Sequence, residues 1–193
     1  MDILGRYYQA LSRIINCYLK IRYREHVELG RNVVFYGRAI FRILPDAQLK
    51  VRDGVIFVSV PSANLVGLTK RSSIAVLSGA TLEIGCNSGF SAVSIVCSTR
   101  ISIGRHCNFG GNVCIWDTDF HPLEWTARRE NSARPATKPI IVGDDVFVGA
   151  NSIILKGVEI GDRAVIGAGS VVSTSIPADE LWAGNPARLI RKL

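Results

Sequence analysis

Histidine is scarce in this sequence, which has three among its 193 residues: His26, His106 and His121. A metal centre built mainly from imidazoles needs ligands at short, regular spacing. His106 and His121 are fifteen residues apart, and His26 is remote from both. The sequence therefore predicts no metal site, and it leaves few candidates for acid–base chemistry.

Paired cysteines and long apolar runs are also missing. The chain has five cysteines, an odd number, and no two of them form a CxxC pair: Cys17, Cys86, Cys97, Cys107 and Cys114. This usage favours reduced thiols in a cytoplasmic compartment over a disulfide framework. Neither a signal peptide nor an apolar run of about 18 residues is recognisable, so we expect a cytoplasmic protein.

Acidic residues are outnumbered by basic ones, 16 against 23, which gives a formal net charge of +7. Such a balance favours anionic partners, but no nucleic-acid motif interleaves the basic residues. We therefore expect no nucleic acid as partner. A phosphorylated cofactor or an anionic membrane face explains the charge equally well. The length indicates one domain, and the 48% hydrophobic content is enough for a continuous core.

A six-residue repeat dominates the stretch from Ile140 to Pro177. Aliphatic residues recur at every sixth position: Val142, Val148, Ile154, Ile160, Ile166 and Val172. Glycine follows in four of these six units: Gly143, Gly149, Gly161 and Gly167. A period of six fits short strands joined by sharp bends, with the aliphatic side chain inward and the glycine where the backbone turns. Such units must stack into a solenoid to bury their apolar faces.

The first 24 residues follow a different pattern. Apolar residues recur there at helical spacing with basic residues between them, which predicts an amphipathic helix over residues 1–24. One interpretation is a cap on the open end of the solenoid. The other is a helix that lies on an anionic membrane surface, which would give peripheral contact with the inner face of a membrane.

The repeat sets the remaining boundaries. We expect the solenoid over residues 25–177, with an imperfect repeat near its start, and a C-terminal tail over 178–193 that packs back as a short strand. Between Phe120 and Pro139 the six-residue units vanish and polar residues replace them. Because the repeat is lost there, we expect an excursion loop over about 120–139. A loop of this length inside a repeat is usually functional.

His121 lies where the repeat gives way to this loop, in the run Asp117-Thr118-Asp119-Phe120-His121. Alternate residues of an extended chain share a face, so Asp117, Asp119 and His121 could converge. A carboxylate beside an imidazole orients it, and an imidazole can accept a proton near neutral pH. We therefore predict His121 as general base and Asp119 as its orienting partner. The alternative is a simple turn leading to Pro122.

These features together resemble the hexapeptide-repeat acyltransferases. The resemblance is carried by WDTDFHP (Trp116 to Pro122), by the six-residue units and by the closing AGNPARLIRKL from Ala183, and it covers roughly Val27 to the C-terminus. It is closest to the galactoside and maltose O-acetyltransferase branch and to enzymes that acetylate capsule and O-antigen sugars. It implies an all-β, left-handed parallel β-helix and a homotrimer with the active site between subunits.

The resemblance also implies a reaction and a cofactor. The acceptor hydroxyl, deprotonated by His121, would attack the thioester of acetyl-CoA, with a backbone N–H as oxyanion donor. The positions that match cofactor contacts are Ala150, Ala168, Ser173, Thr174, Arg188 and Arg191. Two of this chain's residues depart from the family's pattern: Phe147 stands where Trp is frequent, and Thr174 where Lys is frequent.

For the acceptor, the candidates combine amide, hydroxyl and aromatic groups suited to a sugar ring: Asn87, Ser88, Ser91, Trp125 and Arg128. Other functions remain open. They are acetylation of an amino sugar, a metal enzyme resembling γ-class carbonic anhydrases, which the histidine spacing disfavours, and a solenoid that serves only as an assembly scaffold. Cys107 and Cys114 have no visible activating partner and are not predicted as nucleophiles.

Overall fold

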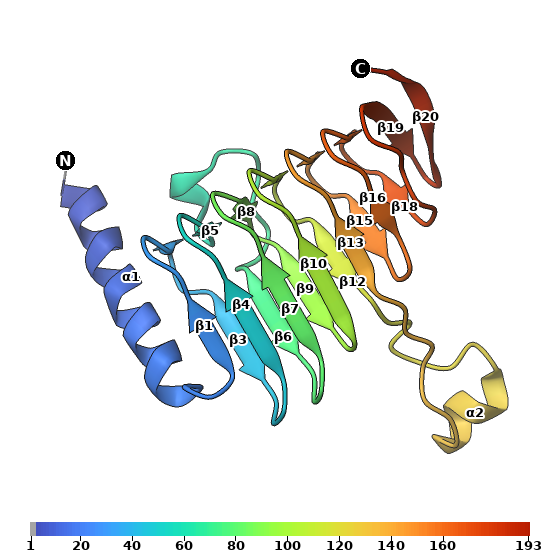
Figure 1. The fold of residues 1–193 in the computed structure, drawn as a ribbon, viewed down its shortest axis with the longest axis horizontal. Coiled ribbons are helices and arrows are strands. Elements are labelled where there is room, and N and C mark those ends of the chain that lie inside the picture. The colour runs from blue at the N-terminus through green and yellow to red at the C-terminus, as the bar shows by residue number, and fades with distance from the viewer. Residues whose placement is uncertain (1–2) are drawn as a thin grey trace.

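The computed structural model describes residues 3–193, with side chains from residue 5 onward. Over this range the chain coils into three parallel sheets with a helix at one end, which is the predicted left-handed β-helix (Figure 1). The helix α1 spans Ile3–Arg22. Met1 and Asp2 of the predicted segment 1–24 lie outside the described residues, as do the side chains of Ile3 and Leu4.

Each turn of the coil contributes one strand to each sheet. Sheet A runs β1 (Val27–Leu29), β4 (Gln48–Val51), β7 (Thr81–Ile84), β10 (Arg100–Ile103), β13 (Ile140–Val142) and β16 (Glu159–Ile160). Sheet B runs β2 (Val34–Tyr36), β5 (Ile56–Val58), β8 (Gly89–Ser91), β11 (Asn108–Phe109), β14 (Phe147–Val148), β17 (Val165–Ile166), β19 (Glu180–Gly184) and β20 (Ala187–Lys192). Sheet C runs β3 (Ile40–Ile43), β6 (Ser73–Val76), β9 (Ser94–Cys97), β12 (Cys114–Trp116), β15 (Ile153–Leu155) and β18 (Val171–Val172). Corners between the sheets stack into an A–B, a B–C and a C–A edge.

The register of the sheets places equivalent residues of successive turns directly above one another. Ile103, for example, pairs with Ile84 on one side and with Val142 on the other. Every aliphatic residue that the six-residue repeat placed inward, from Val142 to Val172, is buried. The period of six is confirmed, because each side of the prism takes six residues, of which two, such as Ile140 and Val142, point inward.

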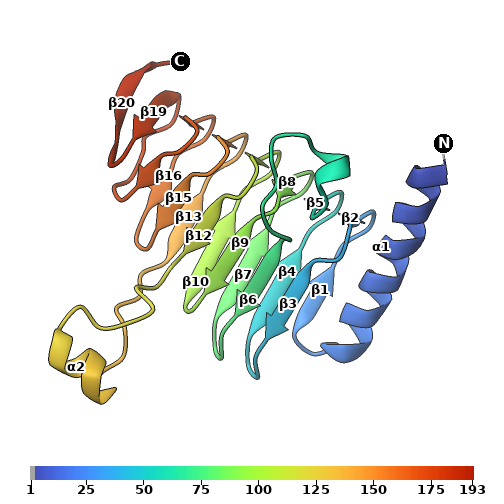
Figure 2. The same ribbon diagram turned by 180° about the vertical axis from the view of Figure 1, so that it is seen from behind.

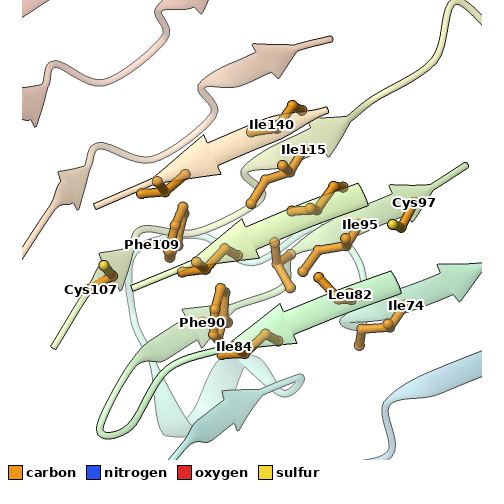
Figure 3. Packing of buried hydrophobic residues seen from close by; sticks show 14 of the residues in the cluster. Ile74, Leu82, Ile84, Phe90, Ile95, Cys97, Cys107, Phe109, Ile115 and Ile140 are labelled. Carbon is orange, nitrogen blue, oxygen red and sulfur yellow. The ribbon is translucent and has the colours of Figure 1, made fainter. Parts of the chain in front are cut away.

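Four phenylalanines stack through the interior under sheet B, a feature that the repeat did not reveal. The ring centroids of Phe35 and Phe57 are 5.3 Å apart, those of Phe57 and Phe90 5.2 Å, and those of Phe90 and Phe109 4.8 Å. Figure 3 shows Phe90 and Phe109 one above the other at one side of the aliphatic core, with Ile84 beside Phe90. Parallel stacking of such rings adds about 0.5–1.5 kcal/mol per pair beyond the burial of their area.

The glycines of the repeat serve a different purpose from the one predicted. Gly143, Gly149, Gly161 and Gly167 do not adopt a positive φ; the left-handed residue comes two positions later, as in Asp145. Glycine is needed because the next turn leaves no room for a side chain. A Cβ on Gly149, for instance, would lie 2.7 Å from the Cα of Ala168. The expectation that glycine marks the sharpest bend is therefore wrong by two residues.

The helix α1 covers the open end of the first turn, as the cap interpretation predicted. Tyr8, Ser12 and Leu19 are buried against this turn. The Ser12 hydroxyl accepts a hydrogen bond from the Phe35 N–H (2.8 Å), and the Asn16 amide donates to the Val33 carbonyl (2.8 Å). No described helix is both long enough and apolar enough to cross a bilayer.

Two segments leave the coil, of which only one was predicted. The predicted loop begins at Asp117 instead of Phe120 and contains the short helix α2 (Trp125–Glu130). The other, over residues 59–72, contains the turn η1 (Pro61–Ala63) and was missed. The coil also extends past the predicted end at Pro177, because β19 pairs in parallel with β17. β20 then folds back antiparallel on β19, as predicted for the tail.

Candidate active site

The excursion loop is closed at its base by a short antiparallel pairing at the C–A edge. The Asp119 N–H donates to the Ala136 carbonyl (3.0 Å), and the Lys138 N–H donates to the Asp117 carbonyl (3.0 Å). Thr118 and Thr137 form a bridge between these two contacts. The two ends of the loop are therefore held together, and the residues near its base have fixed positions although α2 projects away from the prism (Figure 2).

Asp117 is fully buried and anchors the corner of the preceding turn. Its carboxylate accepts backbone N–H donors from Ser98 (2.6 Å), Thr99 (2.8 Å) and Arg100 (3.0 Å), and the Thr99 hydroxyl as well (3.0 Å). Both oxygens of the Asp117 carboxylate therefore accept hydrogen bonds from donors in the coil. Asp117 thus has a structural task and does not face His121.

His121 points into solvent just beyond this base. Phe120 has a φ of 64°, and its ring meets Trp116 edge-on at 5.4 Å. This left-handed residue interrupts the extended chain that would have put Asp117, Asp119 and His121 on one face. The predicted convergence is therefore not found. Within the described residues the His121 ring has no hydrogen-bond partner, and it is exposed.

Asp119 forms an ion pair with a residue that sequence analysis missed. Lys156 lies at the C–A corner of the following turn, and its Nζ is 2.7 Å from the Asp119 Oδ1. The other carboxylate oxygen, Oδ2, is buried and has no partner among the described residues. Thirty-seven positions separate the two residues in the sequence, and only the stacking of turns brings them together.

A groove of about 580 Å³ runs along the C–A edge and ends against the loop. Corner residues of the earlier turns form its floor, and Thr118, Phe120 and Arg134 belong to the part that the loop supplies. Its full lining is Leu44, Leu77, Ser78, Ser98, Thr99, Thr118, Phe120, Arg134, Pro135 and Thr137. Arg134 is the charged residue of this lining, and Phe120 is the chain neighbour of His121. The sequence did not indicate Arg134 as a site residue.

The predicted cofactor residues lie in three places. Ala150 and Ala168 stack at the B–C edge, where their backbone atoms leave no room for a side chain on Gly110 and Gly149 of the preceding turns. Ser173 and Thr174 are exposed at the C–A edge, on the same edge as His121. Arg188 and Arg191 are exposed on β20, at the C-terminal end of sheet B. Within one chain these three groups do not form a single surface.

The predicted acceptor residues of the coil are occupied with structural contacts. Asn87 has a φ of 59°, and its side chain lies over Gly54 at the A–B edge. Ser88 is fully buried, donates to the Gly104 carbonyl (2.9 Å) and accepts from the Cys107 N–H (3.1 Å). Ser91 is also buried and accepts from the Asn64 amide (2.8 Å). The structure therefore does not support contact of Ser88 or Ser91 with an acceptor.

Trp125 and Arg128 lie on α2 and are exposed. The Arg129 guanidinium covers the Trp125 ring at 4.8 Å, and Arg128 donates to the Pro122 carbonyl (3.0 Å) and to the Leu123 carbonyl. Arg128 thus holds the segment that follows His121. Trp125 keeps part of its surface open.

The segment over residues 59–72 lies along the B–C edge. Its Thr69 N–H donates to the Asn112 Oδ1 (2.9 Å), and Asn112 in turn donates to the Gly67 carbonyl (2.9 Å) and to Asn151 (3.1 Å). These contacts tie the segment to the corner of the fourth turn. The segment lies against Gly111 of that corner, since a Cβ there would be 2.6 Å from the Val66 Cγ1, and Gly111 is on the same edge as the predicted cofactor residue Ala150.

Thiol chemistry at Cys97 and Cys107 receives no support from the geometry, whereas the Lys70 Nζ donates to the Cys114 Sγ at 3.1 Å, so the expectation that Cys114 has no neighbouring activating group is wrong. Burial raises the pKa of Cys107 to about 11, and burial, with the nearby Asp117 carboxylate, raises the pKa of Cys97 well above its usual range. Both thiols stay protonated at neutral pH and act as core residues, as expected for Cys97. Among residues 3–193, no group of three or more His, Cys, Asp or Glu side chains is arranged to hold a metal ion.

Comparisons with known proteins agree with the repeat. A family model described as the hexapeptide repeat of succinyl-transferase matches residues 139–174. The 2,3,4,5-tetrahydropyridine-2,6-dicarboxylate N-acetyltransferase of Halalkalibacterium halodurans is 39% identical over 94 residues, which cover 49% of this chain and 34% of that protein. The chain spans less than half the length of the curated relatives that it matches first.

Solved structures extend the likeness over most of the chain. A galactoside acetyltransferase in complex with coenzyme A is 30% identical with a TM-score of 0.56, covering 79% of this chain and 65% of its own. A maltose O-acetyltransferase from Clostridium difficile 630 is 25% identical with a TM-score of 0.59, covering 100% of this chain and 89% of its own. The match of the family model over residues 139–174, the coil of three parallel sheets and these likenesses together show a hexapeptide-repeat fold that is similar to that of the hexapeptide-repeat acetyltransferases.

Proposed function

We propose that the chain transfers an acetyl group from acetyl-CoA to a hydroxyl of a sugar, with a surface polysaccharide or its precursor as the acceptor class. The observation that carries this proposal is the position of His121. It is the histidine at the base of the excursion loop, its ring is exposed and unpaired within the described chain, and its neighbour Phe120 lines a groove. The likeness to a galactoside acetyltransferase bound to coenzyme A supports the donor.

The chemistry proceeds by direct transfer. The His121 imidazole removes the proton of the acceptor hydroxyl as its oxygen attacks the thioester carbonyl carbon. The tetrahedral intermediate collapses, the carbon–sulfur bond breaks, and the coenzyme A thiolate takes the proton back from the imidazolium. A backbone N–H at an adjacent corner is the proposed donor to the oxyanion.

Asp119 and Lys156 would position this base. One oxygen of Asp119 is held by Lys156, and the buried Oδ2, which has no partner among the described residues, is the acceptor that we propose for the imidazole N–H. A carboxylate in that place fixes the ring orientation and stabilises the imidazolium. Arg134 in the groove and Trp125 on α2 are the side chains that we propose for acceptor contact.

For acetyl-CoA we propose the edges next to this groove. Ser173 and Thr174 share the C–A edge with His121, while Ala150 and Ala168 lie on the B–C edge, along which the segment over residues 59–72 also runs. Assembly as a homotrimer would bring the edges of neighbouring chains together. Arg188 and Arg191 would then meet the cofactor phosphates as bidentate donors.

The test replaces the base. His121→Asn is expected to lower acetyl transfer by about 10²- to 10⁴-fold, because general-base catalysis contributes about that much, while binding of acetyl-CoA is unchanged. Transfer is measured as coenzyme A thiol release with sugar acceptors, and binding as the thermal shift with acetyl-CoA. His106→Asn is the matched control, since His106 is exposed at a different edge. Activity of His121→Asn above about one tenth of wild type would refute the assignment.

An amine acceptor is the second candidate, favoured by the 39% identity to an N-acetyltransferase. Hydroxylamine separates the two products, because it cleaves O-acetyl esters and leaves amides intact. A third outcome, no thermal shift with acetyl-CoA and no thiol release with any acceptor, would favour the scaffold interpretation.

A further inference from the structure

The helix α1 has an outward face that its packing on the coil leaves uncovered. Tyr8, Ser12 and Leu19 define the inward face, because they are buried on the first turn. Figure 1 shows α1 at the end of the prism, with the coil on one side of it only. The opposite side of the helix therefore forms the end surface of the molecule.

Large apolar side chains form a continuous stripe on that surface. Tyr7 is 58% exposed, Ile14 66%, Tyr18 55% and Ile21 73%. Their spacing of seven, four and three residues puts them on one side of an α-helix. The coil thus buries one apolar face of α1 and leaves a second one in solvent, which a cap alone does not require.

A basic stripe runs beside the apolar one. Arg6, Arg13 and Lys20 each precede a residue of the apolar stripe by one position, so they lie about 100° around the helix from it. All three are exposed, and within residues 3–193 none of them forms an ion pair. The stretch from Ile3 to Arg22 contains no acidic residue. Among residues 3–193 no acidic side chain compensates the positive charge of this stripe.

A second copy of the chain would not fit this face well. Pairing two such helices would bring two basic stripes together without any acidic residue to receive them, and like charges at close range oppose association. An anionic lipid surface satisfies both stripes at once. Tyrosine and isoleucine enter the boundary between headgroups and acyl chains, while arginine and lysine reach the phosphates beside them.

We propose that the outward face of α1 binds an anionic phospholipid surface, with Tyr7, Ile14, Tyr18 and Ile21 inserted and Arg6, Arg13 and Lys20 at the phosphates. This geometry sets the end of the prism on the membrane and points the coil away from it. The proposal does not rest on the acetyltransferase activity, so each can fail without the other.

The test is co-sedimentation of the full chain with vesicles of phosphatidylcholine, with or without one quarter phosphatidylglycerol. Wild type is expected to sediment with the anionic vesicles and to be released by 0.5 M salt. Replacing Arg6, Arg13 and Lys20 by Gln should weaken binding by roughly 100-fold, since each basic residue near such a surface contributes roughly fivefold. Ile14→Glu with Ile21→Glu should weaken it at least tenfold.

Leu65→Glu is the matched control, because Leu65 is 93% exposed but lies in the segment over residues 59–72. It should bind vesicles as wild type does. Both α1 variants change exposed side chains only, and an unaltered melting temperature verifies their fold. Equal sedimentation with neutral vesicles, no sedimentation of wild type, or an equal loss in Leu65→Glu would each overturn the proposal. Binding to an acidic protein without binding to vesicles would overturn it too.

Discussion

At the scale of single residues, one short run contains side chains with opposite tasks. Asp117 is buried and bound to three backbone donors, whereas His121, four positions later, faces solvent. The residue types made His121 a candidate, and its position at the start of the loop is as predicted. The task of Asp117 depends on the Ser98 to Arg100 corner of the preceding turn, which the sequence alone does not put beside it.

We expect Asp117→Asn to destabilise the fold by about 2 to 4 kcal/mol, because an amide cannot accept all the donors that the carboxylate accepts, and a buried donor left unpaired is costly. Urea unfolding monitored by circular dichroism measures the change. Asp46→Asn serves as control: Asp46 is exposed at a left-handed corner (φ 60°), where Asn is equally at home. A loss for Asp117→Asn below about 0.5 kcal/mol would contradict the anchoring role.

At the scale of elements, the sequence predicts what the repeat encodes and little of what interrupts it. The inward positions from Val142 to Val172 and the end of the helix near Arg22 follow from periodicity. The segment over residues 59–72 was missed because the repeat is imperfect before it. The stacking of Phe35, Phe57, Phe90 and Phe109 was hidden for the same reason, since interruptions of unequal length separate residues that become vertical neighbours.

The A–B edge carries ion pairs between successive turns. The Asp144 carboxylate accepts a hydrogen bond from the Arg105 guanidinium (2.7 Å) and another from the Arg105 backbone N–H (2.8 Å). These two bonds hold the pKa of Asp144 below its usual range. The Arg31 N–H and side chain lower the pKa of Asp53, and the Arg163 guanidinium lowers that of Asp179. The folded chain therefore binds fewer protons than the unfolded chain in acid.

These carboxylates therefore stabilise the fold at pH values above the pKa that they have in the unfolded chain, which is near 4. Their contribution is lost as the pH falls through their lower pKa values in the folded chain. We expect a melting temperature that is nearly flat between pH 7 and 5 and that falls below about pH 4. In Asp144→Asn the fall should be shallower, since one of the titrating groups is gone. Thermal unfolding across this range measures both, and an identical acid slope in the variant would contradict the assignment.

At the scale of the whole molecule, the coil was predictable, but the distribution of the candidate site residues over its edges was not. Residues grouped by resemblance, such as Ala150 and Ser173, lie on different edges of one chain. Outward apolar residues also lie on two different faces, with Ile141 on sheet A and Phe147 on sheet B. A contact between unlike faces closes into a ring when the rotation between neighbouring chains permits it, and the ring that we propose is the homotrimer that the resemblance implies.

We therefore expect sedimentation equilibrium to give a mass of about 63 kDa, three times the 21.0 kDa of one chain. Phe147→Asp should shift it toward the mass of a single chain, because it places a charge in the proposed contact between subunits. Ile14→Glu, on the end surface, should leave the mass unchanged. A wild-type mass of one chain, or of two, would refute the threefold assembly.

The regular spacing of the turns fixes how far each residue of the coil lies from the end surface formed by α1. The excursion loop leaves the end of the fourth turn counted from α1, and successive turns are separated by the spacing of paired strands, about 4.8 Å. His121 is therefore held at a height of about 15 Å above the first turn. Removing or inserting one full turn before Asp117 would change that height in steps of about 5 Å without altering the local site. The number of turns, more than any single side chain, sets how far His121 lies from the end surface.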